Sequence, residues 1–170
     1  MSEFIIDTNV WAVASGKYPQ STPECQEACL EILKSLREVG ASLVMDEASF
    51  MSNPPGNSVL EELKNNLVEG DYGHDLFWRE LYTHWRIDLI ELDYDASGAI
   101  LPNGIVITQQ DNGASCPFEP NDRKWIALHI KHPNNPMIHN AVDSDWEKAR
   151  CDLTSNNIKV KQLCTGRDIP

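Results

Sequence analysis

Short apolar runs that end in acidic residues are the feature that most constrains the fold of this chain. The first run, residues 3–6, leads straight into the triplet Asp-Thr-Asn at 7–9, and a later run, at about 136–141, leads into Asp143 and Asp145. Buried strands of a parallel sheet read as continuous apolar runs, and ligands bind at the carboxyl edge of such a sheet. These runs therefore predict strands that bring distant acidic residues to one edge.

Segments with helical periodicity lie between the apolar runs. Thr22 and Pro23 suit the cap and the first turn of one helix, and Gly40 suits its end. The remaining pattern predicts strands at 41–45, 86–92 and 158–163 and helices at 59–68, 74–85, 122–131 and 146–155. Because strands and helices alternate, we expect one α/β domain over residues 1–170 with a mostly parallel central sheet.

The stretch at about residues 93–113 breaks this alternation. Pro102, Asn103 and Gly104 stand between two apolar runs, which is typical of the tight turn of a β-hairpin. We therefore expect a β-hairpin insertion in this stretch.

The cysteines and the lengths of the apolar runs indicate the cellular compartment in which the protein is expected. No apolar run approaches the roughly 18–20 residues of a membrane span, and the first three residues lack the basic segment of a signal peptide. The cysteines are odd in number, scattered, and without a Cys-x-x-Cys pair: Cys25, Cys29, Cys116, Cys151 and Cys164. This usage predicts a cytoplasmic protein without a membrane partner, whose thiols are reduced and packed as small apolar groups.

The acidic residues at the ends of predicted elements indicate a divalent-metal site. Carboxylates that converge on one point repel each other and raise each other's pKa values unless a cation lies among them. Oxygen ligands without histidine or cysteine suit Mg²⁺ or Mn²⁺ rather than Zn²⁺. For Asp7 and Asp122 taken singly, a cap on the helix that follows is the alternative interpretation.

Three motifs resemble those of the PIN-domain family. The chain opens with Phe-Ile-Ile-Asp-Thr-Asn-Val, continues later with Asn-Asp-Arg-Lys-Trp-Ile-Ala-Leu, and about twenty residues further on has Asn-Ala-Val-Asp-Ser-Asp-Trp. Their order spans the chain apart from the expected hairpin insertion. The resemblance implies a three-layer α/β/α sandwich and metal-dependent cleavage of RNA, as the toxin of a toxin–antitoxin pair or as a defence or RNA-processing nuclease.

The resemblance also assigns roles to individual acidic residues. The first, third and fourth catalytic and metal-binding acids of the family correspond to Asp7, Asp122 and Asp143, and a frequent additional metal ligand corresponds to Asp145. The second family acid is a glutamate on the helix after the second strand, and Glu62 is our choice for it. One or two Mg²⁺ or Mn²⁺ ions held there could lower the pKa of a bound water and orient it toward a phosphodiester.

The position of the second acid is the least fixed part of this assignment. The loop at 51–57 is longer than the family pattern, so Glu61 and Glu47 stay as alternatives to Glu62. Glu61 and Glu62 are adjacent and point about 100° apart on a helix, so only one can face the site squarely.

Other polar residues near the motifs have candidate supporting roles. Thr8, Asn9 and Asn140 are candidates to orient metal ligands or waters. Arg123 and Lys124 are candidates to contact phosphate, with ordinary solvated surface charge as the alternative.

The net charge of −12 argues against strong independent binding to nucleic acid, because phosphate neutralisation by basic residues supplies most of that affinity. It favours either a weak stand-alone nuclease or one that depends on a partner such as an antitoxin. A homodimer is a further expectation from the resemblance. Two alternatives stay open: a scaffold of the same fold that binds a partner protein without catalysis, and a nuclease for structured DNA.

Overall fold

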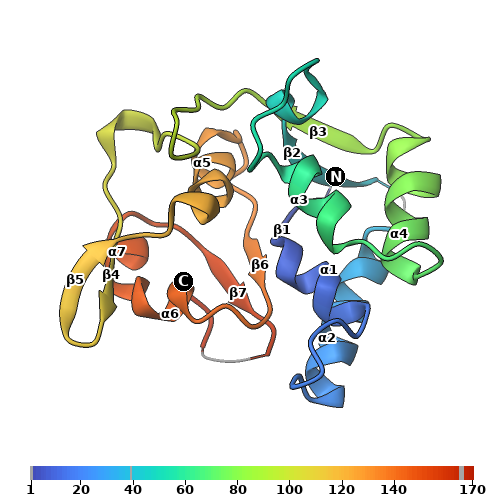
Figure 1. The fold of residues 1–170 in the computed structure, drawn as a ribbon, viewed down its shortest axis with the longest axis horizontal. Coiled ribbons are helices and arrows are strands. Elements are labelled where there is room, and N and C mark those ends of the chain that lie inside the picture. Colours follow the sequence, from blue (N-terminus) through green and yellow to red (C-terminus); the bar gives the residue numbers. More distant parts are fainter. Residues whose placement is uncertain (1, 39, 165–166) are drawn as a thin grey trace.

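A five-stranded parallel sheet forms the centre of the computed structural model, which describes residues 2–38, 40–164 and 167–170. The strand order is β3-β2-β1-β6-β7 (Figure 1), and β1 pairs with both β2 and β6. The bounds are β1 Ser2–Ile6, β2 Ala41–Asp46, β3 Ile87–Ile90, β6 Ile138–Asn140 and β7 Val160–Gln162. The predicted α/β class and the parallel sheet are confirmed.

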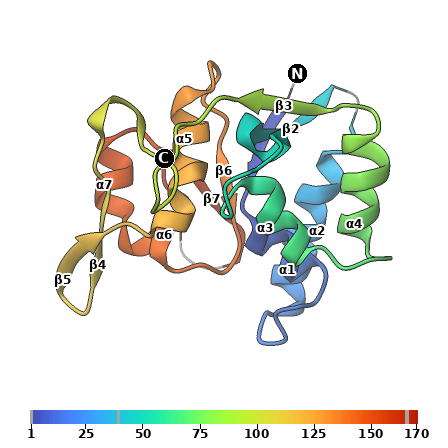
Figure 2. The ribbon, with the colours of Figure 1, turned by 45° about the horizontal axis from the view of Figure 1, so that its top comes forward.

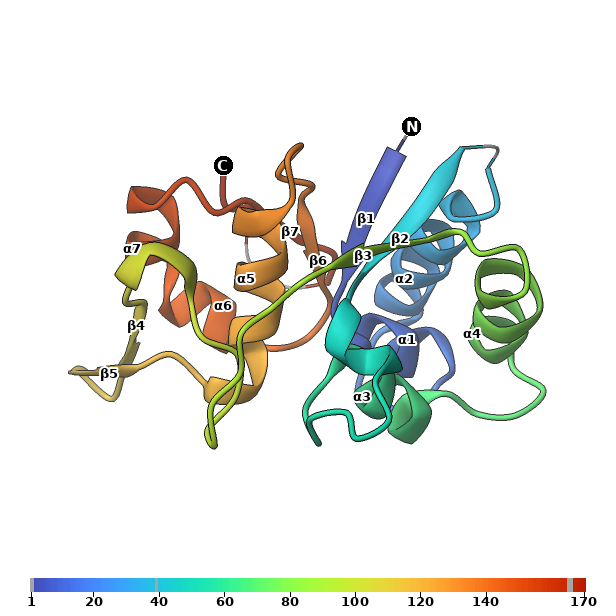
Figure 3. The same cartoon turned by 90° about the horizontal axis from the view of Figure 1, so that it is seen from above.

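Helices lie on both sides of this sheet, with α1 to α4 on one side and α5 to α7 on the other (Figure 3). Their bounds are α1 Thr8–Ala14, α2 Pro23–Ser35, α3 Val59–Asn66, α4 Tyr72–Asp75, α5 Arg123–Lys131, α6 Asp145–Lys148 and α7 Arg150–Ser155. This arrangement is compatible with a three-layer sandwich. It buries the apolar strands between two helical layers, which explains why they read as continuous apolar runs.

Local sequence signals place the start of α2 correctly, but the predicted end at Gly40 is wrong. The helix ends at Ser35, because the backbone bonds beyond it tighten into turns such as the one from the Leu36 N–H to the Leu33 carbonyl. The Thr22 hydroxyl accepts a hydrogen bond from the Cys25 backbone N–H at 3.2 Å, and Pro23 occupies the first helical position of α2. The predicted helix at 74–85 corresponds to α4 and the π-helix Leu76–Tyr82 that continues it. The predicted single helix at 146–155 is instead divided into α6 and α7 at Ala149.

The β-hairpin exists, but the predicted position of its turn is wrong. Strands β4 Thr108–Asp111 and β5 Ala114–Pro117 pair antiparallel and turn at Asn112 and Gly113, which both have positive φ angles of 49° and 81°. Two residues with positive φ are what a tight turn between twisted strands requires. Residues Pro102–Gly104 form a short 3₁₀ turn instead. The hairpin projects beside α6 and α7 (Figure 2).

The loop before the hairpin packs against the turn that precedes α5. Gly98 has a φ of +146°, and a Cβ at this position would lie 2.7 Å from the Pro120 carbonyl oxygen. A glycine is therefore required for this close approach. Through this contact the loop supports the segment that carries Asp122.

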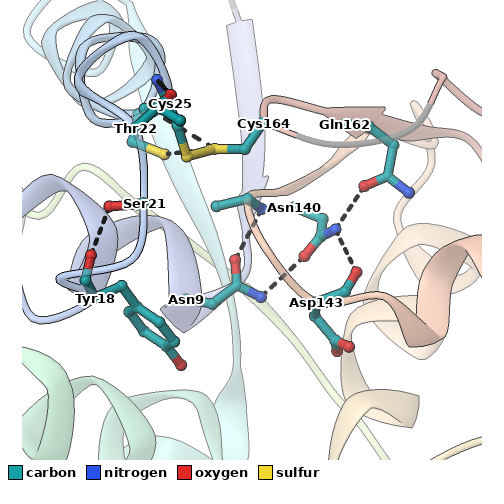
Figure 4. The surroundings of a disulfide bond; sticks show 11 residues. Asn9, Tyr18, Ser21, Thr22, Cys25, Asn140, Asp143, Gln162 and Cys164 are labelled. Atoms are coloured by element: carbon teal, nitrogen blue, oxygen red, sulfur yellow. Dashed lines mark hydrogen bonds between the residues drawn. A yellow bond between two sulfur atoms is a disulfide. The ribbon is translucent and has the colours of Figure 1, made fainter.

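The prediction that all cysteines are reduced is wrong for two of them. Cys25, at the start of α2, and Cys164, just after β7, form a disulfide across a sequence separation of 139 residues (Figure 4). Cys29, Cys116 and Cys151 are free thiols. In the described part of the chain, no helix is long and apolar enough to cross a membrane.

Candidate metal centre

Three acidic side chains meet at the carboxyl edge of the sheet. Asp7 follows β1, Asp143 lies shortly after β6, and Asp122 immediately precedes α5. Each offers a carboxylate oxygen, and these oxygens lie within 4.8 Å of one another. The three acids line a pocket of about 370 Å³ together with Thr8, Asn9, Tyr18, Val142 and Ser144. Residues more than a hundred positions apart therefore share one site.

Asp7 is 3% exposed and acts in two ways. One carboxylate oxygen caps α1 by accepting a hydrogen bond from the Asn9 N–H at 3.2 Å, and the other lies 3.3 Å from the Trp146 indole nitrogen, which donates to it. Burial raises the pKa of Asp7 to about 7, although the Asn9 hydrogen bond and the Lys124 charge oppose this shift. The capping interpretation is correct for Asp7, but it does not exclude a place in the acidic cluster.

Asp122 stands where a helix cap would stand, but it does not cap. Among the described residues, its side chain has no capping hydrogen bond to α5. Burial raises its pKa to about 9, and the nearby charges of Asp7 and Asp143 add to the shift. The Asp122 carboxyl group is therefore directed at the other acids rather than used by its own helix.

Asp143 lies in the loop between β6 and α6. Its Oδ1 accepts a hydrogen bond from the Asp145 N–H at 2.9 Å. Burial is the main cause that raises the pKa of Asp143, and this hydrogen bond opposes it. The Asp145 carboxylate, predicted as an additional metal ligand, instead accepts a hydrogen bond from Lys148 at 2.7 Å. The structure therefore places Asp145 beside the acidic cluster and pairs it with a lysine.

Glu62 reaches the cluster from α3. Its two carboxylate oxygens accept hydrogen bonds from the Thr8 hydroxyl at 3.1 Å and from the Lys124 ammonium at 2.6 Å. The two alternatives lie elsewhere: Glu61 pairs with Lys64 at 2.7 Å on the surface of α3, and Glu47 is exposed after β2. The structure brings Glu62, rather than either alternative, toward the three aspartates.

Lys124 and Arg123, the two candidates for phosphate contacts, have different surroundings. Lys124 is 1% exposed, so the alternative of an ordinary solvated surface charge is wrong for it. Its ammonium donates to Glu62 and to the Asn121 carbonyl. Arg123 donates to the Phe118 carbonyl at 3.4 Å and lines a different pocket. Lys124 is thus an internal cation of the site, and Arg123 lies outside it.

An amide network holds the loop that carries Asp143 (Figure 4). The Asn9 side chain donates to the Asn140 side-chain oxygen at 2.9 Å and accepts from the Ala141 N–H at 2.8 Å. The Asn140 side chain donates to the Asp143 carbonyl at 2.9 Å and to the Gln162 side chain. Asn9 and Asn140 therefore join the ends of β1, β6 and β7, which fixes the backbone of the site.

Several residues of the site were missed by sequence reasoning. The hydrogen bond from Trp146 to Asp7, the place of Gln162 in the amide network and the position of Tyr18 on the pocket wall have no local signal. Asp46 did have a local signal, because it lies at the end of β2 just as Asp7 lies directly after β1. It is fully buried and accepts hydrogen bonds from the Val59 N–H at 2.9 Å and from Ser49. Asp46 therefore anchors the start of the helix that carries Glu62.

The donor set of this cluster fits a hard divalent cation. Asp7, Asp122 and Asp143 supply carboxylate oxygens, the ligands that Mg²⁺ and Mn²⁺ prefer. Burial is the main cause that raises the pKa values of Asp7 and Asp122, and the neighbouring carboxylate charges add to the shift. Lys124 already pairs with Glu62, so a divalent ion would offset two of the three aspartate charges.

Comparisons with protein-family models, with curated proteins and with solved structures found no match to this chain. The PIN-domain resemblance therefore stays a prediction based on the three motifs.

Proposed function

We propose that this protein is a Mg²⁺- or Mn²⁺-dependent nuclease of the PIN type that hydrolyses RNA phosphodiester bonds. One observation carries the proposal: carboxylate oxygens of Asp7, Asp122 and Asp143 converge within 4.8 Å of one another at the carboxyl edge of a parallel sheet. The order of the three motifs along the chain supports the same function. So does the placement of Glu62 on the helix after the second strand.

The three aspartates would hold the ion, and Glu62 would complete the acidic set. When bound, such an ion can activate a water and stabilise the charge that develops on a phosphodiester. The protein's own contribution is to fix the ligands in advance. Trp146 holds the second oxygen of Asp7, and Thr8 and Lys124 hold both oxygens of Glu62. Ligands fixed in this way need little rearrangement when metal and substrate bind.

The charge of the protein supports a dependence on a partner. The chain carries a net charge of −12, and Lys124 is already paired inside the site. The metal would therefore be the main attraction for phosphate at this pocket. We propose that a basic partner protein, of which an antitoxin is one kind, assists substrate capture or blocks the site.

The test is cleavage of a mixed pool of single-stranded and structured RNA in Mn²⁺, Mg²⁺ or EDTA. Wild-type protein is compared with Asp143→Asn and with Asp111→Asn, a control on the exposed hairpin. Cleavage that needs the metal and is lost only in Asp143→Asn is the expected result. Full activity in Asp143→Asn would refute the assignment of the site.

A metal-binding measurement separates this function from a non-catalytic scaffold. A ligand that binds only the folded state raises the melting temperature. We expect Mn²⁺ to stabilise the wild-type protein but not Asp143→Asn. Neither cleavage nor stabilisation by Mn²⁺ would instead favour a scaffold that binds a partner protein.

A further inference from the structure

Three cysteine sulfurs gather where the first turns of α2 meet the end of β7. Cys25 and Cys29 are four residues apart on α2, so their side chains share one face of the helix. Cys164 lies two residues after β7. The three Sγ atoms all lie within 4.8 Å of one another. Two of them form the disulfide, and Cys29 is a buried free thiol beside it.

The spacing of these sulfurs suits a tetrahedral metal ion. Zinc binds thiolates at about 2.3 Å, which places two sulfurs of a tetrahedral site about 3.8 Å apart. The Sγ atoms of Cys29 and Cys164 are 3.9 Å apart. Two ligands of the set come from adjacent turns of one helix, and the third comes from a separate strand end.

We propose that reduction of the Cys25–Cys164 disulfide creates a site where three cysteine thiolates bind a borderline or soft cation, principally Zn²⁺. A dithiol reductant supplies two electrons and two protons, which convert the disulfide into two thiols, and the reductant becomes a disulfide. Binding of Zn²⁺ then displaces the protons of three thiols. Because disulfide sulfurs are not thiolates, the oxidised form and the metal-bound form exclude each other.

The surroundings of the cluster allow an ion to enter. Cys25 and Cys164 line a pocket of about 310 Å³ whose wall includes Tyr18, Thr22 and Val142. Cys164 is only half-buried. A water molecule from this pocket can complete the tetrahedron, as in zinc sites with three protein ligands.

The third thiol can coexist with the disulfide in the oxidised protein. Burial raises the pKa of Cys29 to about 12, and it is the thiolate rather than the thiol that attacks a disulfide. Cys29 therefore does not exchange with the neighbouring disulfide, and it becomes a metal ligand only after a reductant has cleaved that bond.

This thiol cluster differs from the acidic cluster in the ions it selects. Thiolates favour Zn²⁺ and similar cations, whereas the carboxylates at Asp7, Asp122 and Asp143 suit Mg²⁺ and Mn²⁺. The two pockets share Tyr18 and Val142 in their walls. The thiol site does not depend on nuclease activity, so either proposal can fail without the other.

The test uses the full-length protein, reduced with a dithiol that is then removed without oxygen, and titrated with Co²⁺ as a spectroscopic substitute for Zn²⁺. Only thiolate ligands give the near-ultraviolet sulfur-to-cobalt charge-transfer band, so Co²⁺ at the acidic cluster does not contribute to it. We expect this band in the reduced wild-type protein, its loss when Zn²⁺ is added, and no band in the oxidised protein.

One variant removes a proposed ligand, and a second variant serves as its control. Cys29→Ser keeps the disulfide pair and should lower the Co²⁺ affinity at least tenfold, whereas Cys151→Ser, an exposed thiol on α7, should leave it unchanged. Circular dichroism follows the fold throughout, and refolding of a reduced, unfolded chain by the metal also supports the proposal. Wild-type affinity in Cys29→Ser, or no band with the reduced protein either folded or unfolded, overturns it.

Discussion

Replacement of Asp7 by asparagine should stabilise the metal-free protein, and the gain should grow with pH. Burial raises the pKa of Asp7 from an ordinary value of 3.8 to about 7. The folded state therefore binds a proton more tightly than the unfolded state. Stability is highest below the ordinary pKa and falls as the pH rises through the raised one.

The size of this effect follows from the shift. A shift of one pKa unit corresponds to about 1.4 kcal/mol, so a shift of about three units corresponds to an upper limit of about 4 kcal/mol. Asp7, Asp122 and Asp143 titrate together, so a proton bound by Asp122 or Asp143 lowers the energy needed to ionise Asp7. We therefore expect Asp7→Asn to gain on the order of 1–3 kcal/mol at pH 8 and less at pH 5. An asparagine oxygen can still accept the hydrogen bond from the Asn9 N–H.

The assay is urea denaturation in EDTA at several pH values between 5 and 8. Wild-type protein, Asp7→Asn and the exposed control Asp111→Asn are compared. The same series with Mn²⁺ should stabilise the wild-type protein, most strongly at high pH, and leave Asp7→Asn little changed. A stability difference between Asp7→Asn and wild type that does not vary with pH, or equal stabilisation of both by Mn²⁺, would refute this account of Asp7.

Four further predictions test the surroundings of the site. Lys124→Met should cost about 3 kcal/mol in urea denaturation, because it removes a buried cation that pairs with the partly buried Glu62. Lys64→Met should cost less than about 1 kcal/mol, because its pair is exposed. Equal costs would contradict this explanation. In a cleavage assay, Glu62→Gln should abolish metal-dependent activity and Glu61→Gln should not, since of these two glutamates only Glu62 contacts Thr8 and Lys124 in the described structure. The reverse outcome would show that Glu61 is the second acid of the site. Gly98→Ala should lower thermal stability by about 1–3 kcal/mol through the contact with Pro120, whereas Gly56→Ala, where a Cβ meets open space, should be nearly neutral. Reduction of the disulfide without metal should lower the free energy of unfolding by about 2–5 kcal/mol, because the bond closes a long loop in the unfolded chain; unchanged urea curves with a dithiol would show that the bond contributes little.

The sequence alone determines the elements that position the acidic site. Short stretches with apolar residues at 3–6, 41–45 and 136–141 predict buried parallel strands, and the structure confirms these strands. Parallel strands end at the same edge of a sheet, so Asp7 and Asp143, which follow the neighbouring strands β1 and β6, are expected close together. This inference needs only local patterns and the direction of the chain.

Other features have the same local signal in two places, and only packing chooses between them. Asn-Gly occurs at 103–104 and at 112–113, but the hairpin turns at the second pair. There, Asp152 on α7 accepts hydrogen bonds from the backbone and the hydroxyl of Thr108 and anchors β4. Likewise, Glu61 and Glu62 fit the second acid equally well from sequence, because both are in the first turn of α3. The contacts of Glu62 with Thr8 on α1 and Lys124 on α5 decide which one faces the site.

The tertiary structure alone decides the partners of Lys124, Cys25 and Cys164. Lys124 looks like surface charge in sequence, and its burial follows from the position of α3 relative to α5. The two cysteines are 139 residues apart, and no local pattern links them. Their sulfurs meet because the sheet places the end of β7 beside the start of α2. Periodicity and caps are local properties, whereas these contacts depend on how complete elements pack.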